Sequence, residues 1–183
     1  MSESKVISFL AIDLGASSGR AILGNIRNNQ LSMKEISIFD VAKTFLHLES
    51  MTHKKLQKIC YYAQAWHLAL EGEPLFHERF EAWIHGPVCP ELYDYYKTYG
   101  WTNIPVTKEV PHNITGKVYD FIKEIYRAYG QLDGEQLELL SHSEKPWQEA
   151  RKGLKINEPS NETIKHTVMR EYYLKLYEES QND

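Results

Sequence analysis

Apolar residues follow two different periods along the chain, and the change falls near Ser37. Between Val6 and Ile36 short apolar runs alternate with turn residues, including Asn28-Asn29, a pair that tolerates the positive φ of a two-residue hairpin. Beyond this point apolar residues recur every three or four positions, which is typical of helices. The sequence therefore predicts an α+β protein. A three-stranded β-meander over residues 1–36 precedes a predominantly helical single domain over residues 37–183.

Start and stop signals predict the first two helices of the second domain. Ser37 and Asp40 form a capping-box pattern, so a helix should begin here and run to about Glu49. The clearest helix has Thr52 as its N-cap and Gly72 as its stop. Its apolar stripe consists of Leu56, Ile59, Ala63, Trp66 and Leu70. Trp66 is therefore expected to lie inside the protein.

The same period predicts five more helices and one extended segment. The helices are expected over residues 92–99 and 118–129, after a cap at Asp133, from Pro146 to Lys152, and over residues 164–176. Residues 74–84 alternate weakly and predict an extended segment. It leads into residues 85–90, where two prolines and a glycine predict irregular structure.

Composition and charge narrow the functional class. The 183 residues carry a net charge of −4 and are 42% hydrophobic, which suits one ordinary domain and argues against a dominant nucleic-acid-binding surface. No apolar run is long enough for a membrane span, and Asp13 interrupts the apolar start where a signal peptide would continue, so a cytoplasmic protein is expected. Cys60 and Cys89 stand far apart and are expected to be buried thiols. The scattered histidines predict neither a metal site nor a cofactor.

A glycine-rich turn in the first segment has the chemistry of a phosphate loop. It contains Asp13, Gly15, Ser17, Ser18 and Gly19. Glycines let the backbone approach a phosphate, and an aspartate suits Mg²⁺ held through water.

Residues 9–36 resemble the first phosphate loop of rhamnulokinase-type sugar kinases, which have the actin-like ATPase fold. Nothing later in the chain corresponds to their other loops, so a vestigial loop without kinase activity is predicted. Nucleotide or phosphate binding through this loop is the enzyme-class alternative, and the exposed strand edges predict homo-oligomer formation.

Three motifs in the helical region occur in a fixed order. They are Leu56 to Trp66, Phe80 to Val88 followed by Pro90 to Tyr93, and Ser143 to Trp147 followed by Ala150-Arg151. Together they resemble the Panacea domain of the SocA-like, phage-associated family, over about residues 38–177. The resemblance implies an antitoxin that neutralises a cognate toxin by direct protein binding, in a toxin–antitoxin system or in phage defence. One branch implies a proteolytic adaptor that presents its toxin to a protease. A member of this family would be expected to begin near Met33.

Candidate partner-binding residues cluster around the start of the clearest helix. Lys54, Lys55 and Lys58 oppose the helix macrodipole, at a cost of roughly 0.3–1 kcal/mol each when exposed. An acidic toxin surface or a phosphate is the predicted partner that would offset this cost, and a solvated lysine face is the alternative that the pattern favours. Tyr61 and Trp101 are the predicted aromatic contacts, because aromatic anchors favour interface centres. A DNA-binding autoregulator using the same lysines is a further alternative, which the acidic net charge disfavours.

The remaining motif residues are expected to be structural. They are Trp66, Trp83, His85, Gly86, Pro87, Pro90, Pro146 and Trp147. His85 is expected to fix its turn by hydrogen bonds, with a partner contact and an acid–base role as alternatives. No Ser/His/Asp or Cys/His motif has local context, so a binding protein without catalytic residues is predicted rather than an enzyme.

Overall fold

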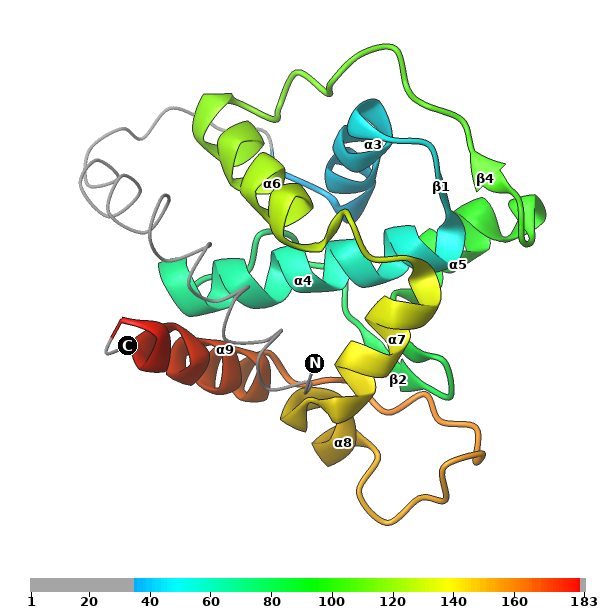
Figure 1. Ribbon diagram of the computed structural model, residues 1–183, viewed down its shortest axis with the longest axis vertical. Helices are drawn as coiled ribbons and strands as arrows, with labels where there is room; N and C mark the ends of the chain where they lie inside the picture. The colour runs from blue at the N-terminus through cyan, green and yellow to red at the C-terminus, as the bar shows by residue number, and fades with distance from the viewer. Residues whose placement is uncertain (1–34, 182–183) are drawn as a thin grey trace.

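The computed structural model describes residues 35–181, and they fold around one long central helix, α4 (Figure 1). In chain order the elements are α3 (Ile38–Leu48), β1 (Met51–Thr52), α4 (His53–Glu71), β2 (Glu81–Trp83), β3 (Gly86–Val88), α5 (Pro90–Tyr96), the 3₁₀ helix η1 (Lys97–Tyr99), β4 (Asn103–Ile104), α6 (Gly116–Tyr129), α7 (Gly134–Ser143), α8 (Lys145–Ala150) and α9 (His166–Ser180). The predominantly helical fold is thereby confirmed. The predicted β-meander and its phosphate loop, Asp13 to Gly19, lie outside the described residues.

The predicted helix caps are present. Ser37 and Asp40 exchange both hydrogen bonds of a capping box at the start of α3. At the start of α4 the Thr52 hydroxyl accepts from the backbone N–H of Lys55, and Gly72 ends the helix at a φ of +78°. A positive φ carries little steric cost for glycine, which explains why α4 stops there.

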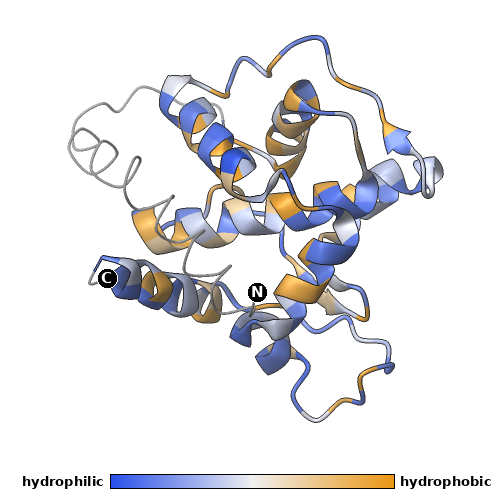
Figure 2. Cartoon of the chain, viewed as in Figure 1, coloured by the Kyte–Doolittle hydropathy of each residue, from blue (hydrophilic) through white to orange (hydrophobic). Residues whose placement is uncertain are grey.

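Helix α4 is covered on nearly all sides. It packs against α9 most extensively and also against α3, α5, α6 and α7. Apolar and polar residues interleave around these helices (Figure 2), and polar side chains of α4 are buried among the apolar ones. Gln64 shows why: its Oε1 accepts from the backbone N–H of Leu75 at 2.8 Å, and its Nε2 donates to the Phe76 carbonyl at 2.8 Å. A polar residue in the core thus satisfies the backbone of an irregular segment.

Strands β2 and β3 form an antiparallel hairpin on one side of α4, pairing Glu81 with Val88 and Trp83 with Gly86. The prediction of irregular structure over residues 85–90 was therefore wrong for Gly86–Val88. Pro87 is tolerated because β3 lies at the edge of the hairpin, where a missing N–H breaks no ladder. On the other side of β2, the Ile164 N–H donates to the Phe80 carbonyl at 2.8 Å, so α9 begins at His166, later than predicted.

The remaining elements close the fold around the ends of α4. Strand β1 pairs with β4, bringing Met51 opposite Ile104. The helix predicted over residues 92–99 is present as α5 followed by η1, and α7 begins with a capping box between Asp133 and Gln136. Within the described residues, none of the helices has the length and apolarity that a membrane span requires.

Candidate functional site

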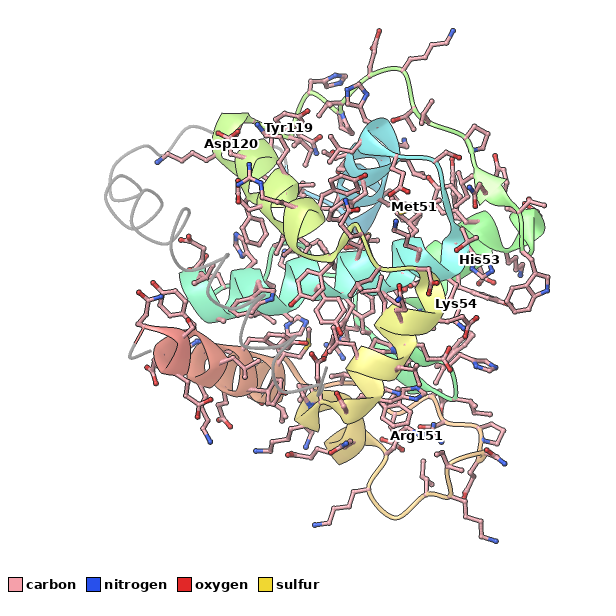
Figure 3. All side chains as sticks on the ribbon, viewed as in Figure 1. Met51, His53, Lys54, Tyr119, Asp120 and Arg151 are labelled. Atoms are coloured by element: carbon pink, nitrogen blue, oxygen red, sulfur yellow. The ribbon has the colours of Figure 1, made fainter. Side chains whose placement is uncertain are left out.

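Lys54 at the start of α4 is neutralised from within the protein. Its Nζ lies 2.6 Å from Glu135 Oε1 and 2.6 Å from Glu138 Oε2, both on α7 (Figure 3). Burial alone would lower the pKa of Lys54, but its hydrogen bonds to these two carboxylates raise it. Burial would likewise raise the pKa of Glu138, but Lys54 and His85 lower it. The acidic surface expected on a partner is thus supplied by α7 of the same chain.

The other two lysines are also paired internally. Lys55 Nζ donates to Glu49 Oε2 and to the Gly130 carbonyl, both at 2.7 Å. Lys58 is 1% exposed and donates to the Pro87 carbonyl at 3.0 Å, and burial lowers its pKa to about 7. Lys55 and Lys58 are therefore not part of an exposed cationic surface, contrary to the prediction. Their side-chain nitrogens donate instead to backbone carbonyls, that of Gly130 after α6 and that of Pro87 in β3.

Tyr61 does not reach the surface either, contrary to the prediction that it contacts a partner. It is fully buried, and its ring packs edge-on against Tyr62, Phe80 and Tyr173. Trp66 is buried as predicted. Its Nε1 donates to the Tyr129 hydroxyl at 2.7 Å. The aromatic residues of α4 build the core rather than an interface.

The first of the three sequence motifs fixes the second. Gln57 of α4 pairs with Cys89 in both directions, accepting from its N–H at 2.9 Å and donating to its carbonyl at 3.1 Å. Lys58 holds the neighbouring Pro87 carbonyl. Pro90 then begins α5 in its first turn, where a missing N–H costs nothing. Both cysteines, Cys60 and Cys89, are buried free thiols, as expected.

The third motif fixes the other strand of the hairpin. Trp147 is buried beside Pro146, and its Nε1 donates to the Trp83 carbonyl at 3.0 Å. Arg151 Nη1 donates to the Ala82 carbonyl at 2.8 Å (Figure 3). All three motifs therefore converge on the β2–β3 hairpin.

Gly86 is required at the turn of this hairpin. Its φ is +91°, and a Cβ there would lie 2.9 Å from Lys58 Cε and 2.9 Å from Ser141 Oγ. Both strain and crowding therefore exclude a side chain. The neighbouring His85 is exposed, and its Nδ1 lies 3.2 Å from Glu138 Oε1. This contact links the hairpin to α7, in keeping with the turn-fixing role predicted for His85.

Trp101 lies on the surface, as its position after Gly100 predicted, with 82% of its area exposed. Tyr95 and Tyr99 are exposed at 59% and 37%. Tyr96 between them is buried, and its ring lies 4.8 Å from that of Tyr95 and 6.2 Å from that of Tyr99. We call Tyr95, Tyr99 and Trp101 the aromatic surface. The exposure of its two tyrosines could have been predicted from the sequence. Tyr95 and Tyr99 are four residues apart and so share one helix face, whereas the buried Leu92 and Tyr96 share another.

Two further residues that hold elements together, Glu138 and Glu144, could not be identified from any local sequence pattern. Glu138 contacts Lys54 of α4 and His85 of the hairpin, and both contacts join segments far apart in the sequence. Glu144 is buried and accepts from the Tyr62 hydroxyl at 3.3 Å and the Tyr173 hydroxyl at 2.6 Å. Among the described residues no three His, Cys, Asp or Glu side chains gather in a way that could hold a metal ion.

The described residues thus form a helical domain whose α4 lysines are paired internally and whose aromatic surface is exposed. A family model described as "Antitoxin SocA-like, Panacea domain" matches residues 56–148, half of the chain, so the chain belongs to this family. It is similar to Antitoxin SocA of Caulobacter vibrioides (strain NA1000 / CB15N), with 31% identity over 104 residues. That match covers 50% of this chain and 55% of the relative, so the chain spans about half of the relative's length. No solved structure matches. The comparisons do not support the kinase resemblance of residues 9–36.

Proposed function

We propose that this protein is an antitoxin that neutralises a cognate protein toxin by direct binding, without catalysis. Membership of the SocA-like family supports the role. The structural observation that supports direct binding is the exposure of Trp101, a large aromatic residue with 82% of its area open to solvent. Buried interfaces are enriched in tryptophan and tyrosine at their energetic centres. In this proposal the toxin contacts the aromatic surface rather than the lysines of α4.

The proposal is tested by co-expressing this protein with the product of the neighbouring gene. Growth rescue and co-purification are scored for the unaltered chain and for Trp101→Ala and Tyr95→Ala/Tyr99→Ala. A central aromatic anchor contributes about 2 kcal/mol or more, so each variant should bind at least about thirtyfold more weakly. Ile156→Ala is the matched control, because Ile156 is also exposed, at 74%, but lies in the loop after α8.

Two results would contradict the proposal at different levels. A neighbouring product that is harmless and does not co-purify removes the antitoxin role for this pair. Full rescue and unchanged binding by both aromatic variants keeps the role but removes the aromatic surface from the interface. A loss in Ile156→Ala as large as in Trp101→Ala would show that the effect is not specific to the aromatic surface.

We also propose that residues 37–183 carry this function and that residues 1–36 are a separate appendage. The capping box at Ser37 supports a boundary close to this residue, because Ser37 and Asp40 satisfy each other's backbone N–H groups at the start of α3. Ile36 also packs against the core, and a version beginning at Met33 retains it. A version beginning at Met33 should rescue growth as well as the full chain. If only the full chain rescues, the first segment belongs to the interface.

A further inference from the structure

A groove lies between the β2–β3 hairpin and the loop that precedes α9. It encloses about 400 Å³ and is lined on one side by Glu81, Trp83, Ile84 and His85. Residues 159–161 (Pro-Ser-Asn) line the other side. The groove is separate in sequence from the aromatic surface, which lies on α5, on η1 and just after η1. It is built by the hairpin on which the three sequence motifs converge.

A carboxylate and an indole are held together in this groove. Glu81 and Trp83 alternate with the fully buried Ala82 along β2, so their side chains share the outward face of the strand. Trp83 Nε1 donates to Glu81 Oε2 at 2.7 Å, which fixes the carboxylate beside the ring. Within residues 35–181 no Lys, Arg or His forms an ion pair with Glu81, although it is half-buried. The groove therefore presents a negative charge without a cation.

The walls of the groove are fixed before any ligand arrives. Arg151 is buried and its Nη2 donates to the carbonyls of Lys155, Ile156 and Glu158, the last at 2.6 Å. One guanidinium thus organises the loop that leads to residues 159–161, while its Nη1 holds the Ala82 carbonyl of the opposite wall. Binding to such a site costs little ordering, because the side chains and the loop are already in place.

We propose that this groove binds the guanidinium of an arginine side chain from a protein partner. A guanidinium is planar and weakly hydrated, stacks on aromatic faces and donates to carboxylates in a forked geometry. Glu81 supplies the charge and Trp83 supplies the ring, and Ser160 and Asn161 line the groove beside them. Glu138 lies behind His85 and is already paired with Lys54, which leaves Glu81 as the charged acceptor of the groove. An anionic ligand would meet the Glu81 carboxylate and is therefore disfavoured.

The test uses a capped tripeptide, acetyl-Gly-Arg-Gly-amide, and the full chain labelled with ¹⁵N. The indole N–H signal of Trp83, assigned with Trp83→Phe, should shift on titration because this group already donates to Glu81. The matched probe carries citrulline in place of arginine, which has nearly the same shape but no charge. It should bind at least about tenfold more weakly, because the neutral ureido group lacks the Coulomb attraction of a guanidinium to the Glu81 carboxylate.

Two substitutions make the test specific to Glu81. Glu81→Gln keeps an acceptor for the Trp83 indole and removes the Coulomb attraction to a guanidinium, so it should weaken arginine binding about tenfold without changing the rest of the spectrum. Glu162→Gln removes an exposed carboxylate from the adjacent segment and should leave binding unchanged. Equal binding of the citrulline peptide, equal binding by Glu81→Gln, or no shift of the Trp83 indole at millimolar peptide would overturn the proposal. No toxin is used, so the result is independent of the proposed antitoxin function.

Discussion

Helix α4 and the α5–η1 segment invert the usual distribution of side chains. In α4, Lys58 and Gln64 are buried, whereas the segment that follows β3 exposes Tyr95 and Tyr99, and Trp101 just beyond it. The buried polar groups of α4 each contact backbone of another segment: Lys58 the Pro87 carbonyl, and Gln64 the loop at residues 75–76. The exposed aromatic residues have no such task. The buried polar groups are explained by the fold, whereas the group of exposed aromatic residues is not, and it supports the partner contact proposed above.

The difference also shows what charge in a sequence can mean. Three lysines at one helix end suggest a surface that attracts an acidic partner. Here each lysine has its acceptor inside the chain: carboxylates of α7 for Lys54, the Gly130 carbonyl for Lys55 and the Pro87 carbonyl for Lys58. A local violation of the helix-dipole rule was therefore offset by tertiary structure rather than by binding.

The largest expected effect comes from truncating Lys58. Lys58→Ala removes a fully buried stem and leaves the Pro87 carbonyl without its donor, so the free energy of unfolding should fall by about 3 kcal/mol or more. Lys58→Met keeps the volume and removes the buried amine, so it should lose only about 1 kcal/mol. Urea unfolding followed by circular dichroism measures both. Equal losses would mean that the hydrogen bond matters and the packing does not.

The second effect is the pH dependence that Glu144 introduces. Burial raises its pKa from 4.5 to about 8, so the folded protein holds a proton that the unfolded chain has released between these values. Its contribution to stability is therefore complete below pH 4.5 and is lost as the pH rises through 8, at up to roughly 1.4 kcal/mol per pH unit. Glu144→Gln should abolish this fall, because the amide still accepts from Tyr62 and Tyr173 but does not titrate.

Lys58 provides an internal control for that pH profile, because its shifted pKa changes stability with pH in the opposite direction. Its pKa falls from 10.5 to about 7 on burial, so the unfolded chain binds the extra proton and stability rises between pH 7 and 10.5. Lys58→Met should remove this rise and leave the loss due to Glu144 in place. A Glu144→Gln profile identical to that of the unaltered protein between pH 5 and 8 would show that Glu144 does not titrate there.

A smaller effect separates the two carboxylates that hold Lys54. The side chain of Glu138 is 14% exposed and that of Glu135 is 71% exposed. Glu138→Gln should cost about 1–2 kcal/mol of stability, because its partners Lys54 and His85 lose a partly buried charge. Glu135→Gln should cost less than about 0.5 kcal/mol, since exposed ion pairs contribute little. Thermal unfolding of the two variants checks the ranking, and the reverse order would assign the anchoring role to Glu135.

Much of the fold could be predicted because its signals are local. Caps such as Ser37 with Asp40 and stops such as Gly72 lie within a few residues of the helix ends that they define. The strand at Gly86–Val88 was missed because the edge position that admits Pro87 depends on tertiary contacts. The candidate site divides in the same way. The exposure of Trp101 followed from its place after a helix stop, whereas the depth of Lys58 is set by a hairpin and a helix far along the chain.

The smallest effect on stability should come from Trp101, and this contrast tests the aromatic surface most directly. Trp101→Ala removes a side chain that is 82% exposed, so the free energy of unfolding should change by less than about 0.5 kcal/mol. Trp66→Ala, the matched control in the core, should cost about 3–5 kcal/mol, because Trp66 is buried and bonded to Tyr129. A stable Trp101→Ala protein that no longer rescues growth would attribute the loss to the interface alone. If Trp101→Ala unfolds as readily as Trp66→Ala, the residue is part of the core in solution, and its exposure no longer argues for a partner.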